Sequence, residues 1–220
     1  YTDIALGIKM PRRRREFKKK SLTIEQVNSL LKSIDTSTLL GMRNYTIINL
    51  MVKTGLRCIE VVRINIADIT QEQGQDVIKI QGKARDEKDE VVPLSPDVLE
   101  CIHDYILLRG NIKEDEPLFV NVGYNGMGKR MTTQYLSMMI KDRLKHIGID
   151  DKQITAHSLR HTAAVLLLEA GEDLYTVQLM LRHSSPKITE RYLKSIERKR
   201  KILNAPALKL DNIIRGYKAV

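Results

Sequence analysis

The stretch "HSLRHTAAVLLLEAG" at residues 157–171 places imidazole and guanidinium groups at the start of an apolar run. His157 and Arg160 are three residues apart, so on a helix they share a face near its amino terminus. Backbone N–H groups and the helix dipole at that end attract anions. Twelve residues further on, "HSSPKITERY" adds His183 and Tyr192. These groups together fit the cleavage of a phosphate ester, whereas a polar i,i+3 pair alone is common on helix surfaces.

Phosphodiester cleavage places negative charge on the phosphate oxygens, and arginine side chains neutralise it with paired hydrogen bonds. A tyrosine, with an ordinary pKa of about 10, needs nearby cations and a proton acceptor before it attacks at pH 7. His157 is the candidate acceptor, because a neutral imidazole is available near pH 7. Two arginines can do the work of a metal ion, and the sequence offers no carboxylate cluster to bind one. We therefore expect neither a metal nor a cofactor.

Two more basic residues stand beside expected chain reversals. "TGLRCIEVVRI" places Arg57 just after Gly55, a candidate helix end, and "QGKARDEK" places Lys83 at the start of a polar hairpin tip. Taken singly, Arg57 is a surface ion-pair partner, Lys83 a solvated turn lysine and Tyr192 an amphipathic core residue. A lysine on a hairpin tip can also reach into a groove and protonate a leaving alkoxide.

In this order the residues resemble the catalytic set of the tyrosine recombinases, also called phage-type integrases. The stretches that match family motifs are "TGLRCIEV", "GKARDEKDEVVPL", "HSLRHTAAVLLLEAG" and "LRHSSPKITERYLKS", within roughly residues 21–198. Their ordered combination is far more specific than any single motif. The resemblance implies an enzyme that breaks and rejoins DNA through a 3′-phosphotyrosyl bond, without ATP or a metal ion.

The resemblance also assigns a role to each matching residue. Arg57 and Arg160 correspond to the two arginines that grip the scissile phosphate. Lys83 corresponds to the hairpin lysine that protonates the leaving 5′ oxygen. The remaining members of the set are the two site histidines and the nucleophile, which are His157, His183 and Tyr192.

Two positions depart from the usual family pattern. Arg182 stands where the family commonly has glycine before the histidine, and Ala84 replaces a common hairpin glycine. Neither change removes a catalytic group, but both can alter the shape of a loop. Three neighbours have expected supporting places: Glu60 beside the first arginine, Lys88 as a lower-ranked hairpin lysine, and His161 as a packing or hydrogen-bonding residue.

The elements that must position these residues are mostly helices. Thr23 and Gln26 fit a capping box ahead of apolar residues at i, i+3, i+4 and i+7 spacing. Apolar pairs on either side of a charged tip predict a β-hairpin around residues 77–92. Further helices are expected over 41–54, just after 57, and over 96–110, 132–148, 157–170, 174–182 and 186–200. The expected fold class is α+β, mainly α-helical, with a small antiparallel sheet or hairpin.

The net charge of the 220-residue chain is +10, and it is placed unevenly. Residues 1–20 and 194–220 carry +6 each, which leaves −2 for residues 21–193. Basic ends usually meet polyanions, nucleic acid before acidic lipid, although solubility also explains them. We expect a basic linker or arm over 1–20. The catalytic domain would cover 21–200, with a tail over 201–220 that docks on a neighbouring protomer.

Cys58 and Cys101 form no C-x-x-C pair and fit reduced structural thiols. No apolar run approaches the roughly 20 residues of a membrane span, and no signal peptide is visible. We expect a cytoplasmic, nucleoid-associated protein without a membrane partner. The chain opens on Tyr1, which suggests a fragment of a longer protein. The resemblance implies double-stranded DNA as partner, a homotetramer on DNA, and accessory DNA-bending or directionality proteins.

The leading hypothesis is site-specific recombination, in the form of integration or excision of a bacterial mobile element. Chromosome-dimer resolution or DNA inversion by the same chemistry stays open, as does relaxation of DNA by a type IB topoisomerase, which joins no new partners. A DNA-binding protein with a decayed site conflicts with the intact six-residue set. Binding to a membrane surface needs an amphipathic helix, which the tail fits only loosely.

Overall fold

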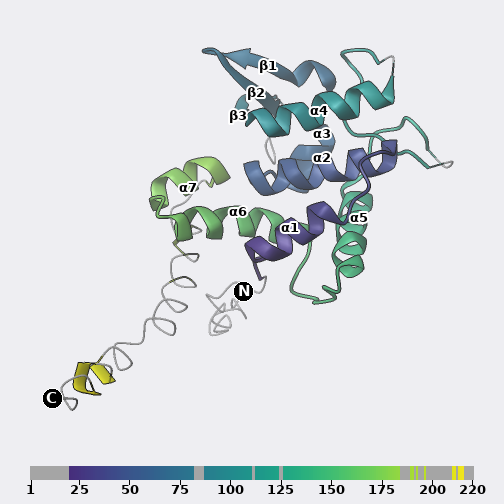
Figure 1. Ribbon diagram of the computed structural model, residues 1–220. Coiled ribbons are helices and arrows are strands. Elements are labelled where there is room, and N and C mark those ends of the chain that lie inside the picture. Colours follow the sequence, from purple (N-terminus) through teal and green to yellow (C-terminus); the bar gives the residue numbers. More distant parts are fainter. Residues whose placement is uncertain are drawn as a thin grey trace, which may run out of the picture.

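The computed structural model describes residues 20–81, 87–110, 112–123 and 126–183, and positions 189, 190, 192, 196, 210, 211 and 213–215 beyond them. Over these residues the chain is mainly helical with one small antiparallel sheet, which confirms the expected α+β class (Figure 1). The helices are α1 Ile24–Lys32, α2 Leu39–Thr54, α3 Cys58–Arg63, α4 Pro96–Arg109, α5 Thr133–His146, α6 Ala156–Ala170 and α7 Leu174–Leu181. None of the helices in the described part of the chain is long and apolar enough to cross a membrane.

Helix ends follow the local sequence signals. The Thr23 side chain accepts a hydrogen bond from the Gln26 amide at 3.2 Å, and the Gln26 side chain accepts one from the Thr23 amide at 3.0 Å, which confirms the capping box before α1. Helix α2 ends at Gly55, whose φ of 63° is the left-handed conformation expected there. Thr132 caps α5 by accepting from the Tyr135 amide at 3.1 Å.

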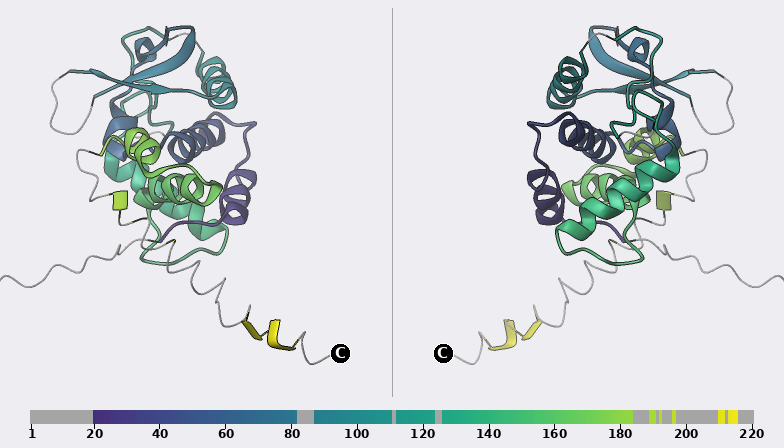
Figure 2. Two further views of the ribbon diagram at one scale, coloured as in Figure 1. Left: turned by 90° about the vertical axis from the view of Figure 1, so that its left-hand side faces the viewer. Right: turned by 90° about the vertical axis from the view of Figure 1, so that its right-hand side faces the viewer.

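The sheet has the order β1-β2-β3, formed by Ile69–Glu72, Gln75–Ile80 and Glu90–Pro93. Strands β2 and β3 are antiparallel, with Ile78 opposite Val92, so the expected hairpin is confirmed. Strand β1 was not expected; its sequence "ITQE" is short and its second half is exposed, which removes the alternating pattern of a half-buried strand. Figure 2 shows the sheet at one end of the molecule, with α4 beside it and the other main helices below.

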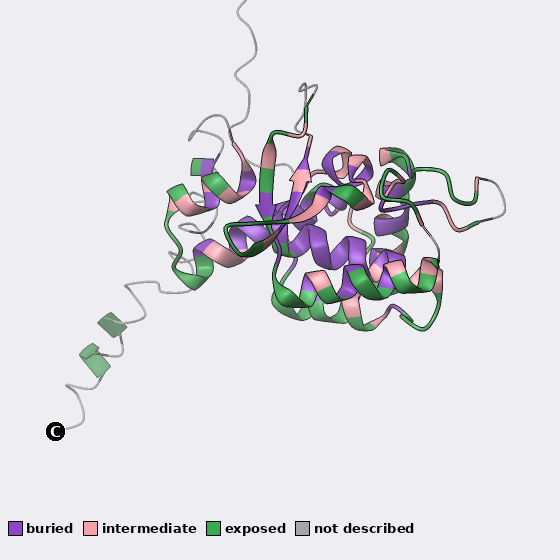
Figure 3. Ribbon diagram, turned by 90° about the horizontal axis from the view of Figure 1, so that it is seen from above, coloured by how far each residue is buried: buried purple, intermediate pink, exposed green. Residues whose placement is uncertain are grey.

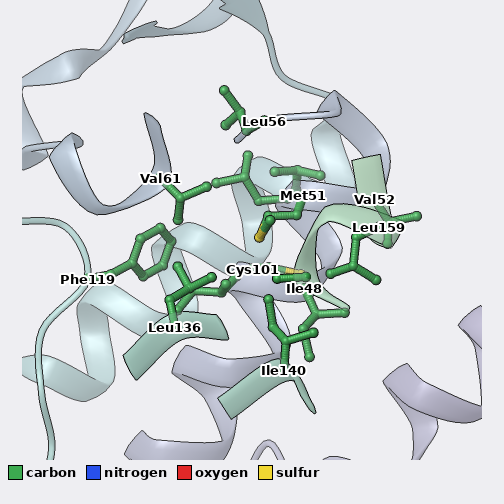
Figure 4. Packing of buried hydrophobic residues seen from close by; sticks show 14 of the residues in the cluster. Ile48, Met51, Val52, Leu56, Val61, Cys101, Phe119, Leu136, Ile140 and Leu159 are labelled. Atoms are coloured by element: carbon green, nitrogen blue, oxygen red, sulfur yellow. The ribbon is translucent and has the colours of Figure 1, made fainter. Parts of the chain in front are cut away.

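Helix α2 is the central element and packs against both α4 and α6. Ile48, Met51 and Val52 of α2 belong to the same buried cluster as Leu159 of α6 (Figure 4). Buried positions gather along the middle of the molecule and exposed ones on its outer helices (Figure 3). This core holds α6 firmly against the C-terminal end of α2, where Gly55 and Arg57 lie.

A second cluster joins the far half of α6 to α7 and to the segment beyond it. Its members are Ala164, Val165, Leu168, Val177, Leu181, Tyr192 and Ile196. Thr189, Glu190, Tyr192 and Ile196 have helical backbone, as expected within residues 186–200. The rest of that expected helix and most of the basic arm over 1–20 lie outside the described residues.

Candidate active site

Arg160 lies inside the protein, with a side chain that is 1% exposed. Its Nη1 donates to the Gly55 carbonyl at 2.6 Å, and its Nη2 donates to the Leu181 carbonyl. Both carbonyls stand at helix C-termini, the ends of α2 and α7, where the helix dipole favours a cation. Burial, followed by the charge of Arg57, lowers the pKa of Arg160 to about 9, so it remains protonated at pH 7.

Arg57 begins α3 and is paired with Glu60 one turn later. The Arg57 amide donates to Glu60 Oε2 at 2.8 Å, and Arg57 Nη1 forms an ion pair with Glu60 Oε1. The Arg57 side chain remains 29% exposed, whereas that of Glu60 is fully buried. The expected support of Arg57 by Glu60 is therefore present, and the guanidinium has one buried anchor and one accessible edge.

Tyr192 is buried in the second cluster and is 1% exposed. Its ring lies against two imidazoles: the centroid of His161 is 4.8 Å away at 46°, and that of His183 is 6.3 Å away at 12°. Burial raises the pKa of Tyr192, while the charges of Arg160 and Arg57 act in the opposite direction. His161, expected to pack or to hydrogen-bond, therefore packs on the candidate nucleophile itself.

His183 follows α7 and is partly buried. Its Nδ1 lies 2.8 Å from the Thr189 hydroxyl. Burial and then the charges of Arg160 and Arg57 lower the pKa of His183 to about 4, with His157 adding to the same effect. His183 is therefore a neutral hydrogen-bonding group at pH 7 in the DNA-free protein.

His157 and Arg160 both lie on α6, three residues apart as expected, but they differ in burial. His157, at the second position of α6, is exposed. Arg160, one turn later, is buried, because most of α6 is packed inside the protein. The two residues are still neighbours of one site, because the charges of both lower the pKa of His183.

The hairpin lysine Lys83 and the substituted Ala84 lie outside the described residues. The lower-ranked candidate, Lys88, is described: its Nζ forms an ion pair with Asp68, and its side chain is 26% exposed. Lys88 is thus already paired with the Asp68 carboxylate beside the sheet. Over the residues the structure describes, no group of three or more His, Cys, Asp or Glu is placed to hold a metal ion.

Arg182 is the residue that sequence reasoning underestimated. It ends α7 in the left-handed conformation, and its Nη2 pairs with Glu60 Oε2 at 3.0 Å. The guanidinium groups of Arg57 and Arg182 therefore both pair with the buried carboxylate of Glu60, and the charges of Arg57, Arg182 and Glu60 all act on the buried Arg160. Such an excess of fixed positive charge favours an anion, and the planar guanidinium groups suit a phosphate.

Comparison with known proteins shows the family of the chain. The phage integrase family matches residues 20–198. The tyrosine recombinase XerC of Chlamydia caviae is 34% identical over 173 residues, which are 78% of this chain and 53% of that protein. The tyrosine recombinase XerD of Listeria innocua is 34% identical over 179 residues, covering 79% of this chain and 57% of that protein.

Among solved structures, the XerH site-specific recombinase bound to a palindromic difH substrate, in a post-cleavage complex, superimposes with a TM-score of 0.70. It is 27% identical, and the match covers 84% of this chain and 52% of XerH. The mainly helical fold with its small antiparallel sheet is that of a tyrosine recombinase catalytic domain. The chain belongs to the phage integrase family. It spans about half the length of the two curated relatives.

Proposed function

We propose that this chain carries the catalytic centre of a site-specific DNA recombinase. The observation that supports it is the meeting of Arg57, Arg160 and Tyr192, which come from the N-cap of α3, from α6 and from the segment after α7. Both guanidinium charges act on the Tyr192 hydroxyl and oppose the effect of burial on its pKa. That combination of a buried phenol with two arginines suits phosphoryl transfer to tyrosine.

In the proposed reaction, Arg57 and Arg160 hold the non-bridging oxygens of one DNA phosphate. Tyr192 Oη attacks phosphorus and loses its proton to His157, while the bond to the 5′ oxygen breaks. Lys83 gives that oxygen a proton, so a 5′ hydroxyl leaves and a 3′-phosphotyrosyl bond remains. Because one phosphodiester replaces another, a 5′ hydroxyl of a second strand can reverse the step without ATP.

His183 has a supporting part in this proposal. Its low pKa keeps it neutral at pH 7, and its Nδ1 already interacts with the Thr189 hydroxyl. We assign it to hydrogen bonding with the phosphate or with Tyr192, rather than to charge neutralisation, which Arg57 and Arg160 supply. The proposed partners are double-stranded DNA, three further copies of the protein in a tetramer, and accessory DNA-bending or directionality proteins.

The test is covalent trapping with Tyr192→Phe as the matched variant. The protein is incubated with a pool of nicked duplexes of random sequence, in which cleavage releases a short fragment that diffuses away. We expect a protein–DNA adduct on a denaturing gel with the native chain and none with Tyr192→Phe, which keeps the ring and its packing. An adduct that survives in Tyr192→Phe would contradict the assignment of the nucleophile.

The finer role is proposed as integration or excision of a mobile element, and resolution of chromosome dimers by the same chemistry is the competing role. Sequencing the trapped DNA separates the two, since the first yields sites at element ends and the second a chromosomal site. Relaxation by a type IB topoisomerase would instead relax supercoiled plasmid without recombinant products. The relatives named above are recombinases, which favours strand exchange.

A further inference from the structure

Arg182 occupies a position where a side chain is unfavourable. Its φ of 50° and ψ of 49° place it in the left-handed region that ends α7, where glycine has no Cβ to clash. Nevertheless the side chain turns inward and is only 10% exposed. A strained backbone that carries a buried charged side chain is often found where that side chain has a function.

Arg182 donates hydrogen bonds from both Nη atoms, while its buried Nε makes no hydrogen bond. Nη1 donates to the Met180 carbonyl at 2.7 Å, and Nη2 donates to Glu60 Oε2 at 3.0 Å. Nε lies at an ion-pair distance of 3.6 Å from Glu90 Oε2 on β3. Both Nη atoms of Arg182 are therefore engaged by protein groups and the side chain is largely buried, in contrast to Arg57, whose side chain keeps an accessible edge.

Arg182 touches the Arg57–Glu60 pair at both of its ends. Its guanidinium holds one carboxylate oxygen of Glu60, while Arg57 holds the other. Its own backbone carbonyl accepts a hydrogen bond from Arg57 Nη2 at 3.4 Å. Arg182, at the end of α7, thus holds both Glu60 and Arg57 in place, although it is more than a hundred residues away from them in sequence.

We propose that Arg182 is a positioning residue, which holds Glu60 ionised and in place and thereby aims the Arg57 guanidinium at the phosphate. The aiming part rests on the function proposed above, but the hold on Glu60 does not. In family members with glycine at this position, the second cationic partner of the carboxylate must be absent or come from elsewhere.

Electrostatics at Glu60 agree with this geometry. Burial acts most strongly and raises the pKa of Glu60, but the charge of Arg182 is the largest single opposing effect, followed by three separate contributions from Arg57, and the pKa is lowered overall. The charged and titratable groups around this network come from α3, α6, α7 and β3, and are Arg57, Cys58, Arg160, Arg182 and Glu90.

The first experiment needs no DNA. The carboxyl carbon of Glu60 is followed by NMR during pH titration of the native chain, Arg182→Lys and Arg182→Gln. We expect the Glu60 midpoint to rise by about one pH unit or more in Arg182→Gln and by much less in Arg182→Lys, which keeps the charge. The same midpoint in all three proteins would overturn the proposal.

The second experiment measures the rate of adduct formation on the nicked-duplex pool. We expect Arg182→Gln to slow it about tenfold or more through misplacement of Arg57, with partial recovery in Arg182→Lys. The double variant Glu60→Gln with Arg182→Gln should be no slower than Glu60→Gln alone, because both changes act through one carboxylate. Multiplying effects would show that Arg182 acts independently of Glu60, against the proposal.

Two controls complete the design. Arg182→Gly relieves the left-handed backbone strain but also removes the side-chain contacts. We expect this variant to form the adduct more slowly than the native chain, because the contacts are lost. A rate at or above the native one would overturn the proposal. Lys145→Gln removes one charge from an exposed side chain paired with Asp150 and should leave the rate unchanged. If the native chain itself forms no adduct, the recombinase proposal fails, while the Glu60 titration still decides whether Arg182 holds that carboxylate.

Discussion

The positively charged guanidinium of Arg160 is buried, so hydrogen bonds to protein groups replace its hydration by water. Two carbonyls at helix ends supply part of that compensation, while Arg57 and Arg182 repel it. The site therefore holds three cations close together before any DNA is present. A bound phosphate would relieve that repulsion, which explains how the same arrangement is unfavourable for stability and favourable for binding.

The lowered pKa of His183 makes a prediction about acid stability. Because its folded pKa of about 4 lies below the ordinary value of 6.5, the folded protein binds fewer protons between these limits, and stability falls as the pH drops through them. We expect the native chain to lose about 1 kcal/mol more than His183→Gln between pH 7 and pH 5, after a discount for partial exposure. Urea unfolding at both pH values measures this difference.

A matched control for that experiment is His103→Gln, because His103 is an exposed histidine on α4. Its pH dependence should follow that of the native chain. If His183→Gln loses as much stability on acidification as the native protein, then His183 is not held neutral by its surroundings.

At the scale of elements, helices α2, α6 and α7 pack closely together around Gly55. A Cβ there would lie 2.7 Å from Leu181 Cδ2, and the φ of +63° is unfavourable for any other residue. We expect Gly55→Ala to lower the free energy of unfolding by about 2 kcal/mol or more, from backbone strain and overpacking together. Its carbonyl also holds Arg160, so adduct formation should slow as well.

Gly148→Ala separates the two causes. Gly148 has a similar φ of +82°, but a Cβ there would meet no atom within 4 Å, so only strain remains and we expect a loss of about 1 kcal/mol. Equal losses in the two variants, measured by urea unfolding, would show that contact with Leu181 adds nothing.

Local signals explain which elements could be predicted from the sequence. Thr23, Thr132 and Gly55 act through their own backbone neighbours, so their roles are visible in a few consecutive residues. Strand β1 was missed because its pairing with β2, and not its own pattern, makes it a strand. The interior position of Arg160 also depends on distant partners, the carbonyls of Gly55 and Leu181.

The same distinction applies to the site. Arg57, Arg160, His183 and Tyr192 were named because of an ordered set of motifs, and the structure places them together. The inward turn of Arg182 could not be predicted, because it depends on Glu60 and Glu90, which approach only in the folded chain. Its one visible signal was an arginine where glycine is usual.

At the scale of the whole molecule, the C-terminal tail presents apolar side chains to solvent. Leu210, Ile213 and Ile214 are 56–59% exposed. Apolar residues on a basic segment suit docking into a groove of a second copy. We therefore expect deletion of 201–220 to weaken assembly on DNA, measured by native gel shift with the trapped duplex, while the thermal unfolding of the chain stays unchanged. Undiminished tetramer formation by the truncated chain would contradict this.

The shared carboxylate of Glu60 has a consequence for engineering by segment exchange. The "LRHSS" stretch reads as a self-contained cassette, yet its arginine completes an ion pair whose other half belongs to α3. A chimera that takes this stretch from a relative with glycine would leave a buried carboxylate with one guanidinium in place of two. The "LRHSS" stretch and α3 should therefore be exchanged together, because a chimera that keeps both from one parent keeps the ion pair intact.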